Sequence, residues 1–173
     1  MINRKMLLED KFFLDPMRKF GVRELSRTTK MDTKTTMKYL KELQREKIIL
    51  RKEELNHIYY EANRQSPVYR HEKSARIVRK IFMSGLIEHL EKKLKPKVII
   101  LFGSIQKGTY HENSDIDIFI QTDYKRLNLN KYDRKVGRKI SLFFEKNPKS
   151  LSKGLLNNIY SGMILSGNLE VIT

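Results

Sequence analysis

Two apolar runs constrain the fold of this chain most, because a polar stretch that begins with Gly-Ser and ends in Asp-x-Asp joins them. The whole feature is LFGSIQKGTYHENSDIDIFI, residues 101–120. The first run, KVIILFGS (97–104), has the length and composition of a buried strand. In the second run, SDIDIFIQT (114–122), isoleucines alternate with Asp115 and Asp117. Because strand side chains alternate between faces, we expect both carboxylates on one face, roughly 6–7 Å apart.

The Gly-Ser turn and the aspartate pair together indicate a site for a phosphorylated ligand and a metal ion. Gly103 and Ser104 would present backbone N–H groups and a hydroxyl, which suit a phosphate. Asp115 and Asp117 would repel each other without a cation, and carboxylates are preferred ligands of Mg²⁺. Phosphate binding and a metal–carboxylate clamp are the requirements of phosphoryl or nucleotidyl transfer. The alternative is a pair of solvated aspartates at a strand end.

The spacing of these residues resembles that of one superfamily. Gly-Ser, ten residues and Asp-x-Asp, present here as GSIQKGTYHENSDID, is similar to the signature of minimal nucleotidyltransferases in the DNA-polymerase-β-like superfamily. The resemblance implies a mixed sheet with flanking helices over residues 96–173. It also implies that Gly103 and Ser104 hold a nucleoside triphosphate. Asp115 and Asp117 would bind Mg²⁺ or Mn²⁺ and serve as catalytic residues.

Active members of that superfamily have a third carboxylate on a later strand, which in this chain is KISLFFEK (139–146). The resemblance aligns the third position with Ser141, and a serine neither acts as a general base nor neutralises Mg²⁺. Glu145 is predicted on the same face but about 13 Å further along the strand. Two alternatives follow. Either Glu145 substitutes as the third catalytic carboxylate, or the site binds nucleotide and metal with impaired catalysis.

Residues 1–65 are predicted to form a second, mostly helical domain. The expected elements are helices over 3–14 and 22–29, a third helix capped by Asp32 or Thr33, and strands over 47–52 and 57–63. Two helices with a tight turn, followed by a β-hairpin, are typical of a winged helix-turn-helix. The segment MDTKTTMKYLKELQREKII resembles the recognition-helix segment of that family.

The third helix of this domain is predicted to be amphipathic. Thr36, Leu40 and Leu43 recur at helical spacing and form one apolar stripe. The opposite face is basic, and we expect its side chains to contact double-stranded DNA: Lys34, Lys38, Lys41 and Arg45. The alternative is a winged helix that binds a protein.

A long helix over residues 66–95 is predicted to connect the two domains. Its apolar residues follow helical spacing from Val68 to Leu94, Ser84-Gly85 loosens or kinks it, and it ends before Pro96. The fold class is therefore α+β, with a winged helix-turn-helix domain (1–65), a connector helix (66–95) and a nucleotidyltransferase-fold domain (96–173).

The net charge of +16 favours a polyanionic partner, usually nucleic acid. The charge is spread over both parts, since residues 1–95 hold 24 Lys and Arg against 13 Asp and Glu. In the basic segment 124–139, four side chains would either approach a triphosphate or a nucleic-acid backbone, or form a solvated helix face: Lys131, Arg134, Lys135 and Arg138. The absence of cysteine excludes disulfides, and apolar runs of only five or six residues exclude a membrane span, so we expect a cytoplasmic protein.

Two functions remain open at this point. The first is a DNA-binding protein whose nucleotidyltransferase domain binds Mg²⁺ and a nucleoside triphosphate and transfers a nucleoside monophosphate to a protein or RNA hydroxyl. The second is a transcriptional regulator or antitoxin-like protein whose impaired nucleotidyltransferase domain senses a ligand or binds a partner. The partners expected are double-stranded DNA and either a HEPN-type toxin or an RNA acceptor, with a homodimer as an open alternative.

Overall fold

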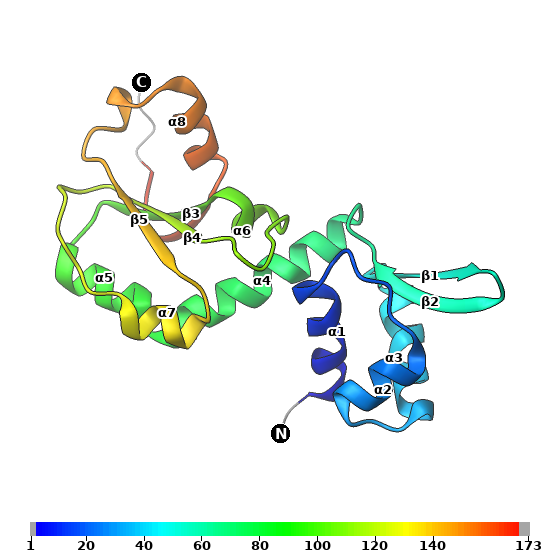
Figure 1. Ribbon diagram of the computed structural model, residues 1–173. Coiled ribbons are helices and arrows are strands. Elements are labelled where there is room, and N and C mark those ends of the chain that lie inside the picture. Colours follow the sequence, from blue (N-terminus) through cyan, green and yellow to red (C-terminus); the bar gives the residue numbers. More distant parts are fainter. Residues whose placement is uncertain (1–2, 170–173) are drawn as a thin grey trace. The chain divides into compact units, whose positions relative to one another are not determined.

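The structure is a computed structural model that describes residues 3–169 (Figure 1). The chain divides into two units, Met1–Lys73 and Ser74–Thr173. The border lies inside helix α4 (Pro67–Ser84), within the segment predicted as a connector. Each unit has its own hydrophobic core.

The first unit consists of three helices followed by a β-hairpin. Its elements are α1 (Arg4–Leu14), α2 (Val22–Thr29), α3 (Thr33–Arg45), β1 (Ile49–Glu54) and β2 (His57–Ala62). The predicted helices and hairpin are thus present in the predicted order. β1 and β2 pair antiparallel, and Phe20 adds an isolated bridge to Tyr60. The hairpin turn is made by Leu55 and Asn56, which both have positive φ.

Helix α3 begins at one of the two predicted caps, Asp32. The Thr35 N–H donates to the Asp32 carboxylate at 2.8 Å, and the Thr35 hydroxyl donates to its other oxygen at 2.7 Å. These bonds hold the pKa of Asp32 below its usual range. Further along, Thr36, Leu40 and Leu43 are completely buried, which confirms the predicted stripe. Tertiary packing of this stripe provides most of the stability of a helix of this length.

Gly85 divides the predicted long helix into α4 and α5 (Leu86–Leu94). Its φ of +78° lies in the left-handed region, where glycine is favoured. Ser84 completes the break, because its hydroxyl donates to the Ile81 carbonyl at 2.7 Å and accepts from the Leu86 N–H at 3.1 Å. The interruption is therefore more complete than a kink.

The second unit is built on a four-stranded mixed sheet of order β5-β4-β3-β6. Its strands are β3 (Val98–Phe102), β4 (Ile116–Ile120), β5 (Ile140–Phe144) and β6 (Met163–Gly167). β3 is antiparallel to β4 and β6, whereas β4 and β5 are parallel. The connections carry α6 (Gly103–Lys107), α7 (Asn130–Val136), the 3₁₀ turn η1 (Pro148–Ser150) and α8 (Lys153–Tyr160).

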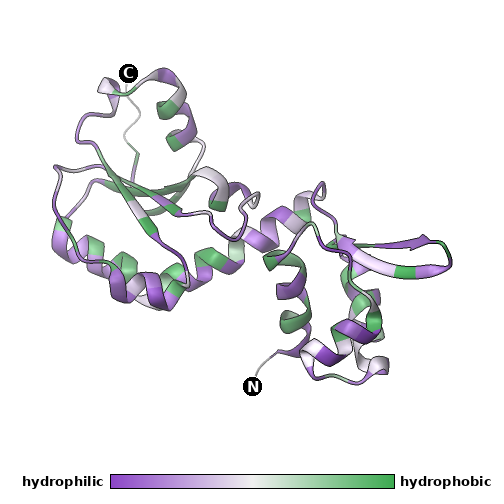
Figure 2. Cartoon of the chain, in the orientation of Figure 1, coloured by the Kyte–Doolittle hydropathy of each residue, from purple (hydrophilic) through white to green (hydrophobic). Residues whose placement is uncertain are grey.

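The two faces of this sheet pack into different clusters. Ile116, Ile118 and Ile120 lie on the face that packs with residues of α4, α5 and α7. The other face joins Ile100 and Phe119 to Ile159 of α8. The predicted alternation in β4 is thus confirmed. Figure 2 shows α5 with alternating green and purple bands, as expected of a helix with one apolar face. The segment predicted as a connector (66–95) also contributes to the core of the second unit. Its residues in the cluster that contains Ile116 are Ile77, Ile81, Leu86, Ile87 and Leu90.

No helix in the described range 3–169 combines the length and the apolar composition that crossing a bilayer requires.

Candidate functional site

The Gly-Ser turn lies directly beside the aspartate pair. The antiparallel pairing of β3 with β4 sets Phe102 opposite Asp117, so the chain leaves β3 next to that carboxylate. Gly103 follows with a φ of +75°, and a Cβ atom added to it would lie 2.6 Å from Oδ2 of Asp117. A side chain at this position would therefore have to displace the carboxylate. Two motifs fourteen residues apart in sequence (Gly103 and Asp117) thus form one local site.

Ser104 stands in the first turn of α6, a single helical turn. Its side chain is partly buried, and its carbonyl accepts the Thr109 N–H at 3.1 Å. The residue that precedes α6, Phe102, supplies no side-chain cap to the N–H groups that open it. At the other end, the Lys107 ammonium donates to Asn158 of α8 at 3.0 Å, which ties the turn to the face that carries the aspartates.

Asp115 and Asp117 are both partly exposed and flank the fully buried Ile116. Burial and the nearby Asp115 carboxylate raise the pKa of Asp117 above its usual range. Two carboxylates held this close disfavour double ionisation, and a divalent cation would remove the penalty. Hard oxygen donors on adjacent same-face positions are the donor set that Mg²⁺ or Mn²⁺ takes. These residues therefore fit a divalent metal ion.

Ser141 occupies the position beside the pair where the resemblance placed a third carboxylate. The parallel register sets Ser141 opposite Asp117, and the Ser141 hydroxyl donates to Oδ2 of Asp115 at 3.1 Å. The Lys139 ammonium lies 3.9 Å from the same oxygen, with 74% of its side chain exposed. The neighbours of the pair are thus a hydroxyl on β5 and a cation just before that strand. Within residues 3–169, no group of three or more acidic or histidine side chains is placed to hold a metal ion.

The structure does not bring Glu145 to the aspartates. It follows the last residue of β5, where its N–H donates to the Ile120 carbonyl at the far end of β4. Its carboxylate accepts the Asn147 N–H at 2.8 Å and so shapes the turn that leaves the strand. Glu145 lies four positions beyond Ser141 along the chain, which corresponds to about 13 Å in an extended strand. The structure therefore gives no support to Glu145 as the third carboxylate of its own chain.

Arg138 holds the loop that delivers Asp115. One guanidinium nitrogen, Nη1, donates to the carbonyls of His111, Glu112 and Ser114 at 2.9, 2.8 and 3.0 Å. The guanidinium also lies 4.6 Å from the centre of the Tyr110 ring. The sequence predicted this arginine either at a phosphate or on a solvated helix face. It acts instead on three carbonyls, which no spacing in the sequence indicates.

The basic residues predicted to contact DNA lie together on α3. A groove of about 510 Å³ runs along the exposed side of this helix. Its lining is Lys34, Met37, Lys38, Lys41, Glu42 and Arg45. All four predicted residues therefore share one surface, which is mainly basic.

Comparison with known proteins finds one similarity, which lies in the second unit. A family model described as "Polymerase beta, Nucleotidyltransferase" matches residues 84–163, which extend from the end of α4 to the first residue of β6. The match contains the Gly-Ser turn, both aspartates and Ser141, so this part of the chain is similar to nucleotidyltransferase domains of the polymerase-β kind. It does not extend into the first unit. No curated protein and no solved structure matches the chain.

Proposed function

We propose that this chain is a DNA-binding protein whose nucleotidyltransferase domain binds a Mg²⁺–nucleoside triphosphate. The observation that supports the proposal is the approach of Gly103 to Asp117, which brings the Gly-Ser turn next to a carboxylate of raised pKa. In this proposal Asp115 and Asp117 hold Mg²⁺ or Mn²⁺, and Gly103 with Ser104 holds the triphosphate. The bound ion would offset negative charge on the phosphates.

Transfer of the nucleoside monophosphate to a protein or RNA hydroxyl is expected to be slow. A transfer of this kind needs the acceptor hydroxyl to lose its proton, and a neighbouring carboxylate is the usual base. Ser141 offers only a neutral hydroxyl, which already donates to Asp115. The arrangement of side chains thus favours ligand binding over rapid turnover. This is the behaviour of a regulator or antitoxin-like protein that senses nucleotide.

Calorimetric titration with each nucleoside triphosphate, in Mg²⁺ and in EDTA, tests the binding step. Asp115→Asn and Asp117→Asn should abolish the Mg²⁺-dependent component. Asp123→Asn is the matched control, because Asp123 is exposed beyond β4 and pairs with Lys146 at 2.9 Å. Incubation with labelled nucleotide and cell lysate then tests transfer to protein or RNA acceptors, including a HEPN-type toxin. Binding that is unchanged in both Asn variants would refute the proposed site.

The proposed DNA binding rests on the groove of α3. Helix-turn-helix proteins insert the second helix of the motif into the major groove, and α3 is the corresponding helix here. Its lysines and arginine would neutralise phosphates and reach base edges. The hairpin β1–β2 follows at the position of a wing. The competing proposal, a surface for an acidic protein, would use the same side chains.

Salt dependence distinguishes these two uses of α3. Each phosphate contact adds about 0.9 to the slope of log K against log salt. Lys38→Ala combined with Lys41→Ala should therefore lower the slope by about 2, while Lys149→Ala, an exposed lysine on η1, should leave it unchanged. If the wild-type chain shows no salt-dependent binding to double-stranded DNA, that result would favour an acidic protein as the partner of α3.

A further inference from the structure

Strand β5 forms an edge of the sheet with an unprotected outer side. In a parallel pair, the N–H and C=O groups of every second residue point to the same side of the strand. The Lys139 carbonyl accepts from the Ile116 N–H, and the Glu145 N–H donates to the Ile120 carbonyl, so the odd-numbered residues from 139 to 145 point toward β4. The N–H and C=O groups of Leu142 and Phe144 therefore point away from β4. In the described part of the chain, the structure gives these groups no hydrogen-bond partner. The Ile140 N–H is the exception, since it donates to Asp133 at 3.0 Å.

The sequence of β5 lacks the features that normally block edge pairing. Natural edge strands carry a charge, a proline or a bulge, because open backbone groups otherwise recruit another strand. The five residues of β5 are Ile-Ser-Leu-Phe-Phe, without charge or proline. By contrast, the opposite edge, β6, pairs with β3 through an irregular register and ends at a left-handed Gly167. Neither edge strand carries a charge, but only β5 pairs with its neighbour in a regular register.

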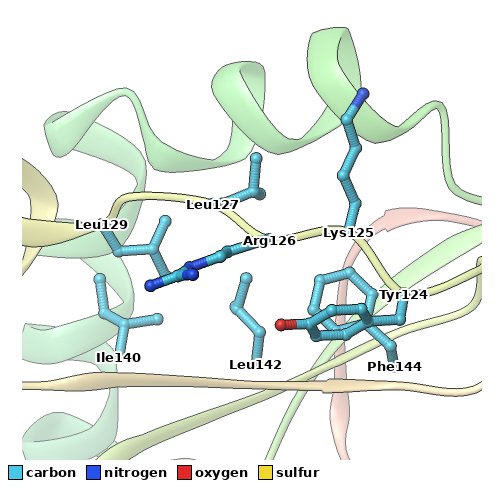
Figure 3. Close-up of a pocket in the computed structure, with 8 residues that line it drawn as sticks. All are labelled: Tyr124, Lys125, Arg126, Leu127, Leu129, Ile140, Leu142 and Phe144. Carbon is cyan, nitrogen blue, oxygen red and sulfur yellow. The ribbon is translucent and has the colours of Figure 1, made fainter.

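An apolar groove lies beside this edge. A cavity of about 210 Å³ opens between β5 and residues 124–129. Figure 3 shows Ile140, Leu142 and Phe144 rising from β5 into the groove, with Tyr124 and Arg126 from the other wall. Tyr124 is 76% exposed, and its ring meets Phe144 edge-on at 5.4 Å. A strand added to β5 would place its own alternate side chains along this groove.

We infer that the occupant of this edge is β5 of a second copy of the chain, paired antiparallel about a twofold axis at Leu142. In this register Leu142 faces Leu142 of the second copy, and the two exchange both N–H and C=O groups. The Phe144 N–H meets the Ile140 carbonyl of the second copy, a pairing that leaves the Ile140–Asp133 bond intact. The pairing thus supplies partners to both outward groups of Leu142, to the Phe144 N–H and to the Ile140 carbonyl, whereas the Phe144 carbonyl gains none because the Ile140 N–H opposite it donates to Asp133.

Charge complementarity selects this register. Lys139 and Glu145 stand just outside the two ends of β5, at equal distances from Leu142. The twofold axis sets Lys139 of each copy opposite Glu145 of the other, so both charged pairs are attractive. Shifting the axis by one residue would lose both. The pairing also places Glu145 of the second copy beside Lys139, which itself lies 3.9 Å from Asp115. The dimer thereby adds a carboxylate to the rim of each site.

Variants in which the charge of Lys139 or Glu145 is reversed, measured separately and as a mixture, test the proposed dimer independently of nucleotide binding. We expect the wild-type chain to sediment at twice its 20.6 kDa mass at micromolar concentration. Lys139→Glu and Glu145→Lys should each raise the dissociation constant about tenfold or more, because two attractive cross-strand pairs become repulsive. An equimolar mixture of these two variants should restore a dimer, since each pair is then again of opposite charge. Lys149→Glu is the charge-matched control and should remain dimeric.

A backbone variant supplies a second test. Leu142→Pro removes an outward N–H and no bond to β4, because proline is tolerated where the N–H of an edge strand faces away from the sheet. With the fold verified by circular dichroism, this variant should be monomeric. A monomeric wild-type chain would overturn the inference. So would a dimer that persists in both charge variants, or a mixture of them that stays monomeric.

Discussion

Ser141→Asp is the substitution that most directly probes the site. It places a carboxylate at the position where the β4–β5 register sets Ser141 opposite Asp117, and where the hydroxyl now lies 3.1 Å from Asp115. The bond to Asp115 is lost, and three acidic side chains then share one face. We expect lower stability without a divalent cation and a larger gain when Mg²⁺ is added.

The magnitude follows from Coulomb's law. Two unit charges 4 Å apart interact by about 4 kcal/mol at an effective dielectric constant of 20, and by about 1 kcal/mol in water. The Asp115 side chain is 39% exposed, so the site lies between these limits. We therefore expect Ser141→Asp to lower the free energy of unfolding by about 2 kcal/mol in EDTA. Saturation with Mg²⁺ at 100 times its dissociation constant would contribute about 2.7 kcal/mol in return.

Urea unfolding at neutral pH, in EDTA and in Mg²⁺, measures both quantities. Ser141→Asn is the matched control, because asparagine has nearly the same shape as aspartate and carries no charge. Ser141→Asp and Ser141→Asn that are equally stable in EDTA and respond equally to Mg²⁺ would contradict this prediction. That outcome would mean that position 141 does not share an electrostatic environment with the pair. In the transfer assay, Ser141→Asp should raise the rate, because a base then stands beside the proposed metal site.

Three further predictions concern the surroundings of the pair. The pKa of Asp117 is raised in the folded state, so the folded chain binds a proton at Asp117 more tightly than the unfolded chain does. The free energy of unfolding of the wild-type protein should therefore fall as the pH rises from about 3.9, the usual pKa of aspartate, through the raised value. Asp117→Asn should lack this decrease in EDTA, and a pH-independent difference between the two proteins would contradict it. Gly103→Ala should cost about 1–2 kcal/mol from its left-handed φ and also lose Mg²⁺-dependent nucleotide binding. Gly137→Ala, whose glycine has a φ of +80° in open space, should show the stability cost alone in the same unfolding and titration experiments. Arg138→Lys should release the loop 109–115, seen as faster proteolysis there and weaker Mg²⁺ binding in a folded protein; unchanged cleavage would show that the carbonyl contacts are dispensable.

Local structure, and which face of a strand or helix is buried, could be predicted from the spacing of apolar residues in the sequence. The alternation in β4 predicts which side is buried, because a strand with one buried face must place every second residue in the core. For the same reason, the stripe on α3 could be predicted from spacing alone. The closeness of Gly103 to Asp117 follows from two strands joined by one connection. The approach of the Gly-Ser turn to the aspartate pair could therefore be predicted from residue types and intervals.

Other features depend on contacts between distant segments. The parallel register of β4 and β5 pairs strands that are not consecutive in the turn of a hairpin, and it determines that Ser141 stands beside Asp117 while Glu145 does not. Arg138 could be placed at the loop carbonyls only once the ends of β4 and β5 were known. The complete break at Gly85 likewise depends on the Ser84 hydroxyl, which a helical pattern in the sequence does not reveal.

The strand order also determines which unit can complete its strand pairing first while the chain is being synthesised. All pairings of the first unit are complete once Ala62 has been added, since its hairpin joins neighbouring strands. The second unit has a different requirement, because Leu101 pairs with Met163 and Val98 with Gly167. At about 5–20 residues per second, the ribosome needs on the order of 5–20 s to proceed from the hairpin to the final strand. During that interval β3 lacks one neighbour while the basic unit is already able to fold. Proteolysis of ribosome-bound chains of increasing length would reveal this order, with protection of the N-terminal unit appearing first.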